Sequence, residues 1–139
     1  MYLLDTNVVS ELRKVHIGKA NGRVAAWAWS VPVVTQYLSA ITVLELEAGV
    51  LRMERKDAPQ GRTLRAWMDD SVLRDFTGRI LEIDIPIALR CARLHVSDPR
   101  PERDAMIAAT ALVHGMTVVT RNVEDFRTTG ALVFNPWEA

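Results

Sequence analysis

The stretch YLLDTN at residues 2–7 decides the fold of this chain. A short apolar run ends in Asp5, and two good helix-capping residues follow before the chain turns apolar again. The pattern predicts a buried strand with Asp5 at its C-terminal end and a helix that begins directly afterwards. Because ligands of open α/β sheets bind at the carboxyl ends of the strands, Asp5 is a candidate site residue.

Length and composition indicate a single folded domain over residues 1–139. Hydrophobic residues make up 49% of the chain and charged residues 24%, a balance typical of globular and not of disordered proteins. The formal net charge is zero, so no global positive field marks the protein for nucleic-acid binding. The single cysteine, Cys91, excludes an internal disulfide and a cysteine-rich metal site.

No segment is expected in a membrane. The apolar residues at 2–4 give way to Asp5 almost at once, which does not fit a signal peptide. No run approaches the roughly 18 to 20 apolar residues that cross a bilayer. A cytoplasmic location is therefore the expectation.

Short apolar runs alternate with amphipathic segments along the whole chain. After the opening strand, the pattern predicts strands within 33–40 and at 80–83, 117–120 and 131–134, and helices at 7–14, 23–30, 42–55, 62–76, 86–96 and 102–114, with a break at 57–61. This alternation predicts the α/β class, with a three-layer α/β/α arrangement around a mostly parallel sheet of four to five strands.

Glu45 follows the second predicted strand, in the first turn of the next helix, and has two interpretations. The sequence TVLE at residues 42–45 fits a capping box, in which the glutamate only satisfies free N–H groups of the helix. Ala48 and Gly49 share the face of Glu45, and their small size leaves space beside a carboxylate that serves a site. The local pattern favours capping.

Asp104 lies on the stripe of its predicted helix that faces the sheet, with Ile107, Ala108 and Ala111. A charge at the top of an apolar stripe costs several kcal/mol unless it is paired or binds a cation. The alternative is a favourable acid in the first helical turn, as Glu102 also is. The alanines indicate close approach of helix and sheet, which would press Asp104 towards the strand ends and favours a site role.

Asn122 and Asp125 follow the strand predicted at residues 117–120. An ordinary turn also uses asparagine and aspartate, so the local pattern leaves turn and site open. With Asp5, Glu45 and Asp104, they would gather acids at the ends of at least three strands, where uncompensated carboxylates repel one another.

A divalent cation would remove that repulsion. An all-oxygen set without histidine or cysteine partners favours Mg²⁺, with Mn²⁺ possible, over zinc. The three histidines, His16, His95 and His114, have no ligand-like spacing with one another or with the acids.

Five motifs occur in sequence along the chain: LLDTNVVSE at 3–11, LSAITVLEL at 38–46, Asp104 with IAATA at 107–111, VTRN at 119–122 and VFNPW at 133–137. As a set, these motifs resemble the PIN domain, and in particular the FitB-like branch of VapC-type toxins from bacterial toxin–antitoxin pairs. The resemblance implies a Mg²⁺-dependent endoribonuclease, usually a homodimer, that is inhibited by a small antitoxin protein which also binds DNA.

The resemblance also implies residue roles. Asp5, Glu45 and Asp104 fall on the family's acidic positions. Where some relatives carry aspartate directly after Thr-Arg, this chain has Asn122, with Asp125 three residues later. Metal-assisted hydrolysis of RNA phosphodiester bonds is the expected mechanism. Asp5 and Asp104 would hold Mg²⁺, and Glu45 would position or deprotonate the attacking water. Asp125 or Asn122 would complete the metal site or hold a second ion.

Thr6 and Asn7 would fix the Asp5 carboxylate, unless they only cap the first helix. Single-stranded or loop RNA is the favoured substrate, because its backbone and bases can be splayed into a shallow acidic site.

Two other classes compete with this interpretation. An aspartyl-phosphate protein also uses an aspartate at a strand end, but it generally needs a late lysine, and no lysine follows Lys56. A non-catalytic binding module would leave the acids inert and could use the four tryptophans as interface anchors.

Overall fold

Five short strands form one sheet in the computed structural model, which describes residues 1–139. The strands are β1 (Tyr2–Leu4), β2 (Gln36–Ser39), β3 (Ile80–Leu81), β4 (Thr117–Val119) and β5 (Val133–Phe134). Their order across the sheet is β3-β2-β1-β4-β5, and each neighbouring pair is parallel. The predicted α/β class and parallel sheet are confirmed, although β3 and β5 are shorter than the predicted strands.

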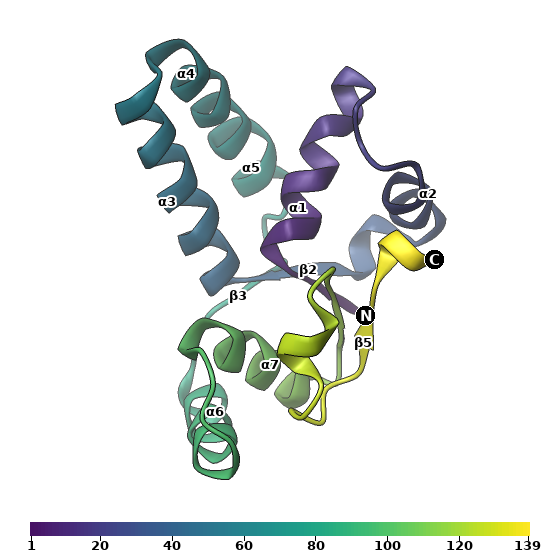
Figure 1. The fold of residues 1–139 in the computed structure, drawn as a ribbon, viewed down its shortest axis with the longest axis vertical. Helices are drawn as coiled ribbons and strands as arrows, with labels where there is room; N and C mark the ends of the chain where they lie inside the picture. The colour runs from purple at the N-terminus through teal and green to yellow at the C-terminus, as the bar shows by residue number, and fades with distance from the viewer.

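Helices cover both faces of the sheet, as Figure 1 shows. One face carries α1 (Thr6–Leu12), α2 (Gly22–Ser30), α3 (Ala40–Lys56), α4 (Ala58–Trp67) and α5 (Leu73–Asp75), and the other carries α6 (Ile85–Ser97) and α7 (Glu102–His114). Short turns complete the chain: η1 (Arg13–Ile17), η2 (Val33–Thr35), η3 (Met68–Val72), η4 (Val123–Phe126) and η5 (Pro136–Glu138). None of the helices combines the length and the hydropathy of a membrane-spanning segment.

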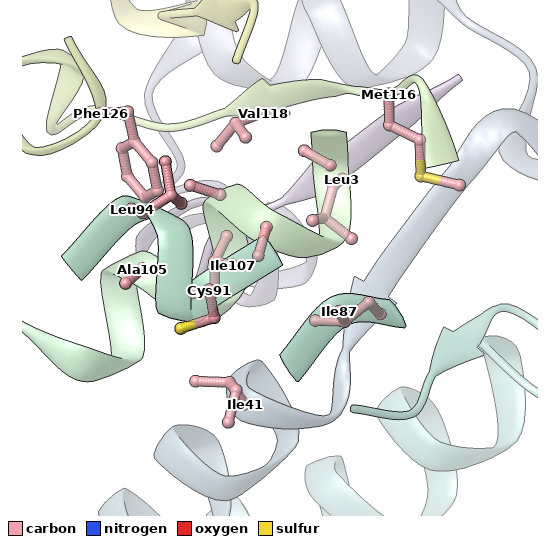
Figure 2. Packing of buried hydrophobic residues seen from close by; sticks show 13 residues of the cluster. Leu3, Ile41, Ile87, Cys91, Leu94, Ala105, Ile107, Met116, Val118 and Phe126 are labelled. Carbon is pink, nitrogen blue, oxygen red and sulfur yellow. The ribbon is translucent and has the colours of Figure 1, made fainter. Parts of the chain in front are cut away.

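The buried side chains form two hydrophobic clusters, one on each face of the sheet, because successive residues of a strand point to opposite faces. Leu3 and Val118 point to the α6 and α7 side, where they meet Ile107 and Phe126 (Figure 2). Leu4 and Val119 point to the opposite side, into the cluster with helices α1 to α3. Leu3, Leu4, Val118 and Val119 are fully buried, so β1 and β4 have little freedom to shift register and the residues after them have fixed places.

The predicted break is confirmed at Asp57, but its extent to residue 61 is wrong, because α4 begins at Ala58 and only Asp57 separates it from α3. The Asp57 carboxylate accepts the Gln60 N–H at 3.2 Å and caps α4. Pro59 lies in the first turn of α4, where its missing N–H costs no hydrogen bond. Gly61 marks the closest approach of the two helices, since a Cβ there would lie 2.5 Å from the Glu54 Cα. Proline and glycine thus shape a tight helical hairpin instead of a loop.

The helix predicted at 62–76 is also not continuous. It consists of α4, the π-helical turn η3 and the short α5. The wide π turn places Met68 and Val72 in the core, with 1% and 3% of their surfaces exposed. On the outer side of the hairpin, the Arg65 guanidinium bonds to both oxygens of Glu47, at 2.7 and 2.8 Å, and to Glu54 at 3.0 Å.

Candidate active site

From β1 the chain adds β2 and β3 on one side of the sheet and then β4 and β5 on the other. The switch point therefore lies between β1 and β4, which are neighbours. Such a switch point is where open α/β sheets bind their ligands, at the carboxyl ends of the strands. Asp5 follows β1 and Thr120 follows β4. The Asp5 N–H donates to the Val119 carbonyl at 2.9 Å and the Thr120 N–H to the Phe134 carbonyl at 3.0 Å, so sheet pairing holds both residues in place.

Asp5 is 6% exposed, and its carboxylate is held from three sides. Oδ1 accepts the Thr6 N–H at 2.8 Å, which makes Asp5 the N-cap of α1. Oδ2 accepts the Thr120 hydroxyl at 2.7 Å and the Asn7 amide at 3.4 Å. Burial raises the pKa of Asp5, the bonds from Thr120 and Thr6 oppose that rise, and the charges of Glu45 and Asp125 add to it. The site therefore contains a carboxylate whose charge is incompletely compensated.

Glu45 lies in the second turn of α3, so both its placement in the first turn and the capping-box interpretation are wrong. The N-cap is Ser39, whose hydroxyl accepts the Ile41 N–H at 3.0 Å. Glu45 Oε1 instead accepts the Thr6 hydroxyl at 2.7 Å, and Oε2 lies 3.8 Å from Arg103 Nη1. Thr6 thus joins two acids, with its N–H on Asp5 and its hydroxyl on Glu45.

Asp104 is half-buried in the first turn of α7. Burial raises the pKa of Asp104 to about 6, and the charges of Asp125, Asp5 and Glu45 contribute to the rise. Since charges affect a pKa in this way only at short range, the fold brings all four predicted acids into one electrostatic site.

Asn122 and Asp125 belong to the turn that follows β4, where Asn122 directly precedes η4 and Asp125 lies within it. The Asn122 N–H donates to the Thr120 hydroxyl oxygen at 3.0 Å, while its side chain caps nothing in η4. Asp125 is exposed, so it is the acid with the most open surroundings. Its charge nevertheless raises the pKa of both Asp5 and Asp104.

Thr120 is a site residue whose role the sequence patterns did not predict. It is fully buried, and its hydroxyl donates to Asp5 Oδ2 while it accepts the Asn122 N–H and, at 3.4 Å, the Asn7 amide. The available signal was its position, because a hydroxyl residue directly after a buried strand can meet the acid that follows the neighbouring strand.

The donor set consists of carboxylate, hydroxyl and amide oxygens, the chemistry that suits Mg²⁺ or Mn²⁺. No three histidine, cysteine, aspartate or glutamate side chains are already arranged around a common metal position. Mg²⁺ keeps several of its waters and typically uses one or two protein carboxylates, so it does not require a closed cage of three. Two carboxyl groups with raised pKa values, Asp5 and Asp104, fit a site that a cation would relieve.

Comparison with known proteins identifies the family of the chain. The PIN domain family matches residues 2–132. The chain is 39% identical to toxin FitB of Neisseria gonorrhoeae, over 99% of both chains, and 37% identical to VapC ribonuclease Y4jK of Sinorhizobium fredii, also over 99% of both. A solved structure of FitAB bound to an IR36 DNA fragment contains a chain that is 39% identical, with a TM-score of 0.87 over 99% of this chain and 96% of that one. The protein described here belongs to the PIN domain family, on the branch that includes toxin FitB.

Proposed function

We propose that the protein is a Mg²⁺-dependent endoribonuclease and the toxin of a toxin–antitoxin pair. The observation that carries the proposal is the meeting of Asp5, Glu45, Asp104 and Asp125 at the switch point of the sheet, where two of them have raised pKa values. The names of its relatives, a toxin and a VapC ribonuclease, support both the reaction and the biological role.

Asp5 and Asp104 would hold the cation, because burial and mutual repulsion leave these two carboxyl groups most in need of a positive charge. When bound, the cation supplies charge stabilisation at the phosphate oxygens and polarises a water molecule. Mn²⁺ has the same ligand preference and should substitute.

Glu45 is the candidate for positioning and deprotonating the attacking water. Its Oε1 is fixed by the Thr6 hydroxyl at 2.7 Å, and its Oε2 lies 3.8 Å from Arg103 Nη1, so the carboxylate has a defined orientation. Asp125 or Asn122 would complete the site from the turn after β4. The exposure of Asp125 leaves room on that side for an RNA strand, and a single-stranded or loop region could reach it.

The proposed partner is an antitoxin protein that itself binds DNA. The similar solved structure is described as FitAB bound to DNA, which supports a partner protein and DNA contact for the assembled pair. A homodimer, which the family resemblance implies, and a cytoplasmic location, which the sequence predicts from its lack of a signal peptide or a long apolar run, belong to the same proposal.

RNA cleavage with and without divalent cation tests the proposal. Total RNA and a defined single-stranded RNA are incubated with the purified protein in Mg²⁺, in Mn²⁺ and in excess EDTA, and the new ends are mapped. We expect internal cuts with either cation and none in EDTA. Cleavage that persists in EDTA would overturn the metal requirement. No cleavage together with saturable RNA binding would favour a non-catalytic binding module.

The Thr120 hydroxyl has a predicted role in orienting Asp5. Replacing Thr120 with Val keeps the shape of the side chain but removes the donor at Asp5 Oδ2. Loss of such a supporting bond typically lowers metal affinity or activity by about 10- to 100-fold. Mg²⁺ titrations of the cleavage rate should show this loss in Thr120→Val and recovery in Thr120→Ser, which keeps the hydroxyl. Equal rates in both variants would contradict the role.

A further inference from the structure

A cavity of about 500 Å³ opens beside the candidate active site, between the turn after β4 and the C-terminal turn η5. It shares two residues, Asn122 and Asp125, with the site, and Asn135 lines it from the η5 side. Its volume is within the range of small-molecule sites, and only one lining residue, Val123, is hydrophobic. An RNA strand whose phosphate reaches Asp125 would pass this cavity with the adjoining nucleotide.

The charges of the lining do not suit a phosphate. Two arginines, Arg121 and Arg127, face three acids, Glu124, Asp125 and Glu138. Arg127 is already paired with Glu124. The remaining charges of the lining are the single positive charge of Arg121 and the two negative charges of Asp125 and Glu138. A phosphate would meet a negative balance here, whereas a neutral polar group would not.

Arg121 offers a planar surface for such a group. Its guanidinium carbon lies 5.2 Å from the centroid of the Trp137 ring, and its backbone N–H donates to Asn7 Oδ1 at 3.2 Å. The backbone of Trp137 is held at two points. Its carbonyl accepts a hydrogen bond from the Arg23 guanidinium at 3.4 Å, and its backbone N–H donates to Asn135 Oδ1 at 2.9 Å. Arg121 is exposed, so an RNA base can reach its guanidinium from solvent, and unstacked RNA bases stack on guanidinium planes.

Two side-chain amides supply hydrogen-bonding groups. The Asn135 oxygen is occupied by the Trp137 N–H, which leaves the Asn135 amide nitrogen as a donor towards the cavity. The Asn122 side chain caps nothing and keeps both its donor and its acceptor. Amides of this kind pair with the edges of nucleobases.

We propose that this cavity receives one unstacked base of the RNA next to the phosphate that is cut. Arg121 stacks on the base, and Asn135 and Asn122 read its edge, so the cavity sets a base preference beside the cleavage position. This inference rests on the proposed ribonuclease function and adds the source of its sequence selectivity.

Cleavage of a randomised single-stranded RNA, with the ends sequenced, tests the inference. Arg121→Lys keeps the charge but removes the plane, and Asn135→Ser keeps a capping oxygen for Trp137 but removes the amide donors. Arg93→Lys, on α6 and outside this cavity, is the matched control. We expect the wild type to favour one base beside the cut, and both test variants to weaken that preference by about tenfold.

Mn²⁺ titration of the same proteins separates the base subsite from the metal site. Mn²⁺ affinity should be the same in the wild type and in all three variants, and Arg93→Lys should keep the wild-type base preference. Metal-dependent cleavage with an unchanged base pattern in Arg121→Lys and Asn135→Ser would overturn the base subsite alone. A uniform loss of rate at all bases would overturn it as well. Absence of cleavage by the wild type would instead overturn the proposed function, and the base subsite with it.

Discussion

Asp104→Asn is expected to abolish metal-dependent RNA cleavage while it makes the metal-free protein more stable. Loss of residues that only support a ligand costs about 10- to 100-fold, so loss of a proposed direct ligand should cost at least roughly 100-fold. The variant keeps the size of the side chain and removes the charge that burial and three neighbouring acids oppose. Cleavage rates at saturating Mg²⁺ measure the first effect.

The gain in stability follows from the raised pKa of Asp104. The carboxyl group has a pKa of about 6 in the folded protein and an ordinary value of 3.8. Between these values the folded state holds a proton that the unfolded state has lost, so the free energy of unfolding falls as pH rises from about 4 to 6. The rise of the pKa by roughly two units lowers the free energy of unfolding by at most about 3 kcal/mol at about pH 7. The Asp104→Asn variant has no such charge and would not lose this stability.

Thermal unfolding without metal, at about pH 5 and about pH 7.5, on either side of the folded-state pKa, measures this second effect. The wild type should lose more stability than Asp104→Asn between the two pH values. Added Mg²⁺ should stabilise the wild type and leave the variant largely unchanged, because ligand binding to the folded state raises its stability. Equal pH dependence of the two proteins would show that the charge of Asp104 does not destabilise the fold. An equal response to Mg²⁺ would show that Asp104 is not a metal ligand.

Gly61→Ala is expected to cause the largest loss of stability from a single methyl group. The new Cβ would lie 2.5 Å from Cα and 2.9 Å from N of Glu54, so it would meet backbone that cannot rotate away. Forcing α3 and α4 apart should cost about 3 kcal/mol, or about 10 °C in melting temperature for a chain of this size. Thermal and urea unfolding measure the change.

Gly49→Ala is the matched control for Gly61→Ala, because it lies on the same hairpin, inside α3, with no atom within 4 Å of its added Cβ. Alanine is the better helix former, so this variant should gain about 0.5 to 1 kcal/mol. If both variants changed stability alike, helix propensity and not the close approach at Gly61 would control the hairpin.

Local sequence patterns were sufficient for the sheet and for the position of Asp5. The apolar run that ends in Asp5 specifies a strand, and full burial of Leu3 and Leu4 explains why no polar alternation interrupts it. The same local reasoning failed at Glu45, because Ser39 and Thr42 are both good capping residues and only the end of β2 decides between them. The hairpin was missed because Gly61 serves a contact with Glu54, which no local pattern reveals.

The roles within the site depend on pairing that spans most of the chain. Thr120 is 115 residues from Asp5, and the bond between them exists only because β4 inserts beside β1. Thr6 was predicted as a support for Asp5, and its bond to Glu45, 39 residues away, requires α1 and α3 to meet. Such contacts follow from the arrangement of the strands and not from the composition of any segment.

The central position of β1 has a consequence for synthesis of the protein. Asp5 is the first of the four acids to be synthesised, but the residue that bonds to it, Thr120, follows 115 residues later. At about 5 to 20 residues per second, that interval lasts roughly 6 to 23 s. Until then β1 lacks β4 as a neighbour, and Asp104 and Asp125 are missing or unplaced. A nascent chain therefore carries no assembled acidic site, and the proposed cleavage requires that β4 and the turn after it have emerged and joined the sheet.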